Sequence, residues 1–308
     1  MRVLLVLLAL SLAAQTPVRR PKILGVAHIA LWVADLAKSR AFYIDFLGFD
    51  EPYSLKRDDG TESMGFIKIN ENQYIELTPG NRTRGDGQLN HFSFYTDDAK
   101  ALRDYLASRG VKVPDTVGKG RLRNTNYNIA DPDGHTVELF QYEPDSLTRA
   151  AQGKFIPDTR ISTQMIHVGF VTGPLQRAMD FYHGVLGFEE TWRGSANGSK
   201  ELSWVNMRVP DGTDYVEFML YKDEPDARRR GTMNHICLMV PDMDKAVAIL
   251  ESRRAKAGYD RPMEIRTGVN RKRQCNLYDP DGTRVELMEP STVDGKPAAV
   301  STLPPPKP

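Results

Sequence analysis

Four histidines and four glutamates recur at matched places along the chain. Each histidine begins a short run of apolar residues, and each glutamate lies between apolar neighbours 48, 47, 50 or 51 residues later. The pairs, in chain order, are His28 with Glu76, His91 with Glu138, His167 with Glu217 and His235 with Glu286. A buried carboxylate is costly unless it is paired or binds a metal. Imidazole together with carboxylate suits Zn²⁺, Ni²⁺, Mn²⁺, Co²⁺ or Fe²⁺, so the pattern predicts divalent-metal sites of two histidines and two glutamates.

Such a site could do chemistry, because four protein ligands leave two positions open on a six-coordinate metal. Two adjacent open positions can hold two neighbouring oxygens of one substrate, and the metal then acts as a Lewis acid on a substrate oxygen. A histidine taken alone on an apolar strand is more often a structural residue. A glutamate between apolar neighbours can also face solvent on an alternating strand. Four matched pairs, kept while the surrounding sequence diverged, favour metal ligands over both alternatives.

A repeat supplies the elements that must position these residues. Phe42–Phe49 recurs as Phe181–Phe188, and the Asp-Pro-Asp-Gly turn with its following strand recurs in both halves. Each half divides again into two modules that read strand, helix and three further strands, with Asp35 and Asp97 as expected helix caps. If the first and last strands of a module are neighbours, its histidine and glutamate point into the same space.

Length and composition fit two soluble domains. The 308 residues are 40% hydrophobic and 26% charged, and 41 basic residues balance 40 acidic ones. This balance gives no support for a nucleic-acid partner, and we expect a monomer or homodimer acting on a small molecule. We expect five segments, namely a signal peptide at 1–14, a first domain at 23–144, a linker at 145–162, a second domain at 163–290 and a Pro-rich tail at 291–308.

The segment Met1–Ala14 has the three parts of a secretory signal. One arginine precedes a short apolar run, and small residues follow it. The apolar run is too short to span a bilayer comfortably. We therefore expect an exported protein, periplasmic or secreted, with no membrane association after cleavage of the signal.

These motifs resemble the vicinal oxygen chelate superfamily of glyoxalase I, extradiol dioxygenases, methylmalonyl-CoA epimerase and the bleomycin-resistance proteins. The resemblance rests on the strand that begins at His28, on Phe42–Phe49, on Asn90-His91, on Asp131–Phe140 and on their second-half counterparts. It implies an α+β fold of two tandem domains, each with two βαβββ modules that form a cup-shaped mixed sheet around a divalent metal. By position, all eight histidines and glutamates named above match metal ligands of the glyoxalase and epimerase type.

The resemblance leaves three functions open. An isomerase or lyase of the glyoxalase type uses a metal-associated glutamate as its catalytic proton carrier, and Glu76, Glu138, Glu217 or Glu286 could take that role. An Fe²⁺ dioxygenase would use His167, His235 and Glu286, but the family's catalytic tyrosine position holds Asn276 here. The third alternative is a non-catalytic binding protein of the resistance type.

Several other residues have weaker claims to a role. Strand alternation predicts a polar face of substrate-binding residues, namely Asn124, Asn126, Asn128, Gln274 and Asn276, although an outward polar face is equally compatible. Arg82, Arg84 and Arg228–Arg230 precede two of the histidines and could reach an anionic substrate. Strand parity places Cys237 and Cys275 on opposite faces, which predicts no disulfide. His135 and His183 fall outside the ligand pattern, and we expect them to be exposed.

Overall fold

Eleven regular elements follow one another in the first half of the chain. The computed structural model describes residues 18–80, 87–223 and 226–307. The elements are β1 (Ile23–Val33), α1 (Leu36–Arg40) and its π-helical continuation η1 (Ala41–Phe46), β2 (Asp50–Lys56), β3 (Glu62–Asn70), β4 (Gln73–Pro79), β5 (Leu89–Thr96), α2 (Ala99–Ser108), β6 (Gly118–Lys119), β7 (Thr125–Ala130) and β8 (Thr136–Gln141).

The second half repeats this order after a short linker helix, and between its modules it has one helix with no counterpart among the described elements of the first half. Its elements, preceded by α3 (Leu147–Ala150) in the linker, are β9 (Met165–Thr172), α4 (Leu175–Tyr182), β10 (Glu189–Gly194), β11 (Trp204–Arg208), β12 (Tyr215–Leu220), α5 (Ala227–Met233), β13 (His235–Met239), α6 (Met243–Ala257), β14 (Ile265–Thr267), β15 (Lys272–Tyr278) and β16 (Arg284–Thr292).

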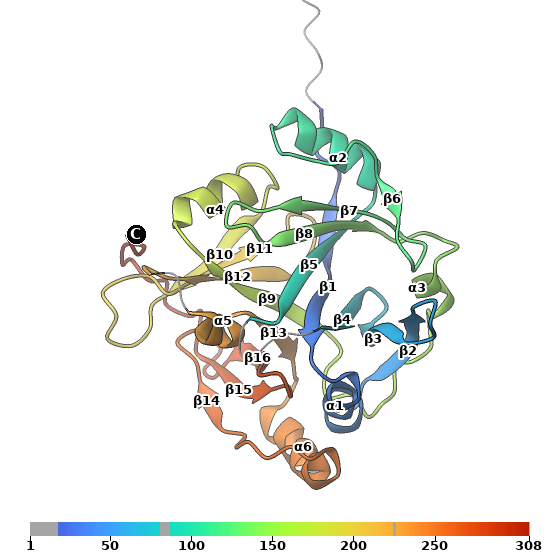
Figure 1. The fold of residues 1–308 in the computed structure, drawn as a ribbon. Coiled ribbons are helices and arrows are strands. Elements are labelled where there is room, and N and C mark those ends of the chain that lie inside the picture. Colours follow the sequence, from blue (N-terminus) through green and yellow to red (C-terminus); the bar gives the residue numbers. More distant parts are fainter. Residues whose placement is uncertain (1–17, 81–86, 224–225, 308) are drawn as a thin grey trace, which may run out of the picture.

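Each half forms its own curled eight-stranded mixed sheet (Figure 1). The strand order is β2-β3-β4-β1-β5-β8-β7-β6 in the first sheet and β10-β11-β12-β9-β13-β16-β15-β14 in the second. Within a module the first and last strands pair in parallel, and the two modules join through antiparallel β1–β5 or β9–β13. The predicted βαβββ modules and cup-shaped sheets are confirmed, and each set of candidate ligands is assembled within one half.

The two sheets pack through the faces that lie opposite the candidate ligands. Phe92 of β5 stacks on Phe170 of β9 with ring centroids 4.5 Å apart, and Phe94 packs edge-on against Phe188. Phe92 and Phe94 alternate with residues of the ligand-bearing face of β5. One apolar core therefore spans both halves and holds the two sheets against each other.

The two Asp-Pro-Asp-Gly turns also bind the halves together. Asp131 accepts a hydrogen bond from the Tyr182 hydroxyl at 2.9 Å, and Asp279 accepts one from Tyr43 at 3.2 Å. His135 follows the first turn, and its ring packs on Phe170 with only 14% of the side chain exposed. The expectation of an exposed His135 was therefore wrong, because the turn docks on the other half.

The linker and the C-terminal tail both lie against the domains. The fully buried ammonium of Lys68 donates to the carbonyl oxygens of Ala151 and Lys154 in the linker. In the tail, Ala299 accepts a hydrogen bond from the Trp192 indole. The two sheets occupy 23–141 and 165–292.

Two smaller predictions have mixed outcomes. Asp35 caps α1 as predicted, but α2 is capped by Asp98, whose carboxylate accepts from the Ala101 amide, and not by Asp97. Asp97 instead accepts from the Lys22 amide, which ties β1 to the start of the second module. Cys237 and Cys275 are both free thiols, as strand parity predicted.

Two further predictions lie outside the described residues. The signal segment Met1–Ala14 is one of them, and the loop that contains Arg82 and Arg84 is the other. None of the helices in the described part of the chain is long and apolar enough to cross a membrane.

Candidate metal centres

Four neighbouring strands carry the four candidate ligands in each sheet. In the first sheet the ligands lie on β1 (His28), β4 (Glu76), β5 (His91) and β8 (Glu138), and the order β4-β1-β5-β8 makes these strands adjacent. In the second sheet β12, β9, β13 and β16 carry Glu217, His167, His235 and Glu286 in the same order. We call the two concave faces that carry these residues the first cup and the second cup.

The four side chains of the first cup converge. The Nε2 atoms of His28 and His91 lie 3.0 Å apart. Glu138 Oε2 lies 2.6 Å from Nε2 of His28 and 3.5 Å from Nε2 of His91, whereas the Glu76 oxygens lie 3.7 and 3.9 Å from them. All four side chains are nearly buried, and His91 is the most exposed at 15%.

The second cup repeats this geometry and adds a sulfur. The Nε2 atoms of His167 and His235 lie 2.9 Å apart, Glu286 lies 3.6 and 3.4 Å from them, and Glu217 lies 3.4 Å from His235. The Cys237 sulfur lies within 4.8 Å of ligand atoms of His167 and Glu286. Cys237 lies two residues after His235 on β13 and so shares its face, a parity signal that could have identified it as a candidate ligand.

Both sets of donor atoms fit one divalent cation. Metal–nitrogen and metal–oxygen bonds of about 2.0–2.2 Å place neighbouring donor atoms about 3 Å apart around the ion. The separations in the two cups, which run from 2.6 to 3.9 Å, are of this size. Two carboxylates and two imidazoles buried together also need a compensating positive charge, which a divalent cation supplies.

The two carboxyls of each cup have opposite pKa shifts. Burial raises the pKa of Glu76 in the first cup and of Glu217 in the second. Burial also disfavours ionisation of Glu138 and Glu286, but the neighbouring histidines outweigh it and hold the pKa of both carboxyls far below its usual range. Two carboxyls whose environments separate their pKa values are suited to different roles in proton transfer.

A cluster of aromatic and aliphatic side chains lies in the first cup. Phe66 and Tyr74 are buried there together with Leu122, and Leu147 of the linker helix packs against them. The Tyr53 ring lies 5.1 Å from that of Phe66. Glu138 in this cup also accepts a hydrogen bond from the side-chain amide of Asn126.

The second cup contains a cavity of about 90 Å³. Its lining is Trp192, Trp204, Glu217, Val269, Asn270, Gln274, Asn276, Arg284 and Glu286. The Arg284 Nη2 atom lies 2.8 Å from Nδ1 of His235, and burial together with this guanidinium lowers the pKa of His235 to about 3. Sequence reasoning missed Arg284, which takes the place of Thr136 in the repeat.

The predicted substrate-binding residues do not share one environment. Gln274 and Asn276 line the cavity of the second cup beside both glutamates. In the first half, Asn126 binds Glu138, and Asn128 is exposed opposite Glu138 in the strand register. The side-chain NH₂ of Asn124 donates to the Thr148 hydroxyl in the linker, and its side-chain oxygen accepts from the backbone N–H of Glu143. Asn124 therefore ties the linker to the first sheet.

Curated relatives include named lyases. The chain is 34% identical over 125 residues to the uncharacterized protein YaeR of Escherichia coli, covering 38% of this chain and 95% of the relative. It is 31% identical over 122 residues to a probable lactoylglutathione lyase of Synechocystis, covering 37% and 92%. It is 22% identical over 287 residues to the lactoylglutathione lyase of Schizosaccharomyces pombe, covering 87% and 89%.

Solved structures and a family profile agree on the architecture. An extradiol ring-cleaving dioxygenase from B. fuscum superposes with a TM-score of 0.66 at 19% identity, over 93% of this chain and 77% of the other. The profile described as Glyoxalase/Bleomycin resistance protein/Dioxygenase superfamily matches residues 25–139 and again 164–287. The chain is therefore a two-domain member of the Glyoxalase/Bleomycin resistance protein/Dioxygenase superfamily.

Proposed function

We propose that the chain is a metal-dependent enzyme whose second cup acts on a small oxygenated metabolite by proton transfer, as an isomerase or lyase. The observation that carries this proposal is the cavity of the second cup, which is lined by Glu217 and Glu286 together with Gln274, Asn276 and Arg284. The first cup holds the same ligand types, but apolar side chains occupy the corresponding space.

Unpartnered polar atoms in the second cup support a polar ligand. In the second cup Asn206 Oδ1, Asn276 Oδ1, Arg284 Nε and His167 Nδ1 are buried without a hydrogen-bond partner among the described residues, and in the first cup the hydroxyls of Tyr53 and Tyr74 are too. Buried polar atoms are nearly always hydrogen-bonded in folded proteins. A ligand with several oxygens would satisfy those atoms that face the cavity, and the Arg284 guanidinium would favour a ligand with negative charge.

The roles of the residues follow from their positions. His167, His235, Glu217 and Glu286 would hold a divalent cation, which would supply Lewis-acid catalysis at a substrate oxygen. Glu217 would move the proton, because it lines the cavity and lies 3.4 Å from His235, whereas Glu286 lies within 3.6 Å of both histidines. Gln274 and Asn276 would orient the substrate, and Trp192 and Trp204 would exclude water from it.

The names of the relatives support the proposed reaction type, and the N-terminal sequence supports export. The relatives named lactoylglutathione lyase favour the lyase and isomerase class over the others. Export, which the sequence of Met1–Ala14 favours, is part of this proposal. Glutathione thioesters are chiefly cytosolic, so we propose a different oxygenated substrate for an exported protein.

The test combines metal content with turnover. The full chain, purified without chelators or affinity-tag metal, would be assayed by elemental mass spectrometry and against α-oxoaldehyde–thiol adducts and 2-hydroxy ketones. We expect bound divalent metal, and we expect His167→Ala to abolish turnover while His28→Ala retains it. Oxygen consumption with catechols would instead favour an Fe²⁺ dioxygenase. No metal after dialysis against Mn²⁺, Fe²⁺, Ni²⁺ and Zn²⁺ would favour a binding protein.

A further inference from the structure

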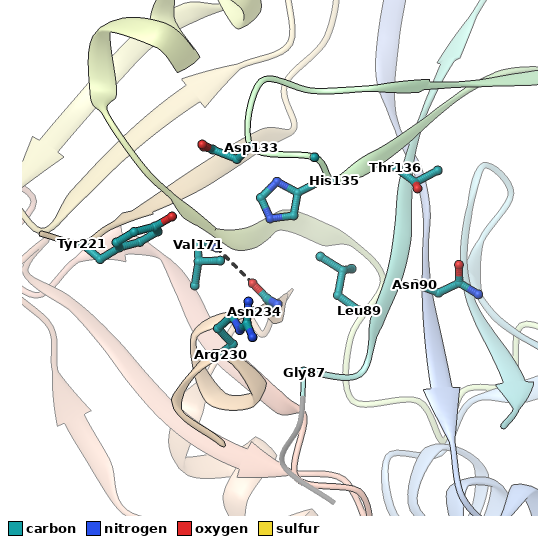
Figure 2. A pocket seen from close by; sticks show the side chains of 11 residues that line it. Gly87, Leu89, Asn90, Asp133, His135, Thr136, Val171, Tyr221, Arg230 and Asn234 are labelled. Atoms are coloured by element: carbon teal, nitrogen blue, oxygen red, sulfur yellow. Dashed lines mark hydrogen bonds between the residues drawn. The ribbon is translucent and has the colours of Figure 1, made fainter. Parts of the chain in front are cut away.

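A second cavity, of about 350 Å³, lies between the two halves of the chain (Figure 2). The first half contributes His135 and Asp133, and the second half contributes Arg230 of α5 and Asn234, which precedes β13. None of the eight candidate ligands of the cups lines it. The cavity lies at the lower end of the range of volumes that bind small molecules.

His135 gives this cavity a hydrogen-bond acceptor. Its Nδ1 lies 2.9 Å from a carboxylate oxygen of Asp131, which also accepts from the Tyr182 hydroxyl. In a neutral imidazole whose Nδ1–H donates to this carboxylate, Nε2 is the acceptor. The ring centroid of His135 lies 5.0 Å from that of Phe170 and 6.3 Å from that of Phe92, and these contacts together with Asp131 orient the imidazole that lines the cavity.

Donors and a positive charge face His135 across the cavity (Figure 2). The Asn234 side-chain oxygen accepts from the Val171 amide at 3.0 Å, which leaves the amide NH₂ for a ligand. Arg230 contributes a guanidinium to the same wall. Among the described residues of the lining, the carboxylate is that of Asp133, which pairs with Arg177 and accepts a hydrogen bond from the Gly173 amide.

The rest of the lining includes the polar residues Asn90, Thr136 and Tyr221 and a small aliphatic surface. Leu89 of β5 and Val171 of β9 face the cavity between the donors and His135 (Figure 2). The cavity therefore combines a cation with an amide donor, one oriented acceptor and a small aliphatic surface.

We propose that this cavity binds a small hydroxycarboxylic acid with an aliphatic side chain. Its carboxylate would bind Arg230 and Asn234, its hydroxyl would donate to Nε2 of His135, and its side chain would contact Leu89 and Val171. This site is independent of the function proposed for the second cup, because the residues that would bind the acid are not residues of that cup.

Calorimetric titration of the full chain with 2-hydroxyisovalerate tests this inference, with isovalerate as the probe that lacks the hydroxyl. We expect 2-hydroxyisovalerate to bind about tenfold more tightly than isovalerate, and Arg230→Gln to weaken both at least tenfold. Arg230→Lys should retain part of the affinity because it keeps the charge. His135→Phe should remove the preference for the hydroxyl without removing isovalerate binding.

The matched control is Arg273→Gln, which removes a guanidinium that pairs with Asp244 and lines neither cavity. We expect it to leave both affinities unchanged, and Arg284→Gln tests for binding in the second cup. Loss of binding in Arg284→Gln with retention in Arg230→Gln would place the acid in the second cup and overturn the inference. The absence of measurable binding to the unmodified chain would overturn it as well. Thermal unfolding of each variant would show that the loss of binding is not a loss of folding.

Discussion

The two cups carry the same four side-chain types on the same four strands, yet their surroundings differ. Opposite the first glutamate in the strand register, the first cup has Phe66 and the second has Asn206. At the start of the last strand, the first cup has Thr136 and the second has Arg284. The first of these substitutions fills one cup with apolar groups, and the second adds a cation to the other. Duplication thus preserved the polar centre twice but kept room for a ligand beside it in the second cup.

The largest expected difference between the cups is catalytic. Glu217→Gln removes the carboxyl that we propose as proton carrier, and we expect turnover to fall about 10²- to 10⁴-fold. The matched Glu76→Gln in the first cup should change turnover less than threefold, because a cluster of Phe66, Tyr74 and Leu122 lies in that cup. Steady-state kinetics of both variants with equal metal loading would measure this difference. The reverse ranking would assign the active site to the first cup.

A matched substitution should lower the free energy of unfolding more in the first cup than in the second. Phe66 is 1% exposed within the apolar cluster, so Phe66→Ala should lower the free energy of unfolding by about 3–5 kcal/mol. The matched Asn206→Ala removes a side-chain oxygen that has no hydrogen-bond partner among the described residues, and we expect a loss below about 1 kcal/mol. Urea denaturation of the two variants would compare them. Equal losses would mean that both cups are packed alike.

The polar centres could be predicted from the sequence because they leave a periodic signal. His28 and Glu76 lie at the first and last strands of a module, and the parallel pairing of β1 with β4 brings them together. The side chains that surround these centres could not be predicted in this way, because Phe66 and Asn206 lie on the equivalent strands β3 and β11, which carry no sequence motif. The docking of His135 was also hidden, since it depends on how the two halves pack.

The helix α5 could not be predicted from the repeat either. It is an insertion between the third and fourth modules, with no counterpart among the described elements of the first half. Arg230 was foreseen as a residue that could reach an anion. Its position between the halves, rather than over the second cup, depends on the direction of this helix.

The smallest expected effect concerns the charge beside His235. Burial and Arg284 lower the pKa of His235 to about 3 in the second cup, whereas Glu76 and Glu138 outweigh burial and raise the pKa of His28 in the first. A histidine whose pKa is lower in the folded chain than its ordinary value of about 6.5 destabilises the fold as pH drops from about 6.5 toward 3. A histidine whose pKa is raised by folding has the opposite effect, since it stabilises the fold below about 6.5 and loses this contribution as pH rises through its folded pKa.

Replacing Arg284 by threonine, the residue of the first cup, should therefore raise the pKa of His235 and reduce the loss of stability in acid. The measurement is an NMR titration of the labelled histidines in metal-free protein, together with urea denaturation at pH 7 and pH 5. Thr136→Ser in the first cup is the control, because it adds no charge and should leave the pKa of His28 unchanged. An unaltered His235 pKa in Arg284→Thr would mean that burial alone lowers it. The electrostatic part of the difference between the cups would then be absent, and only the packing difference at Phe66 and Asn206 would remain.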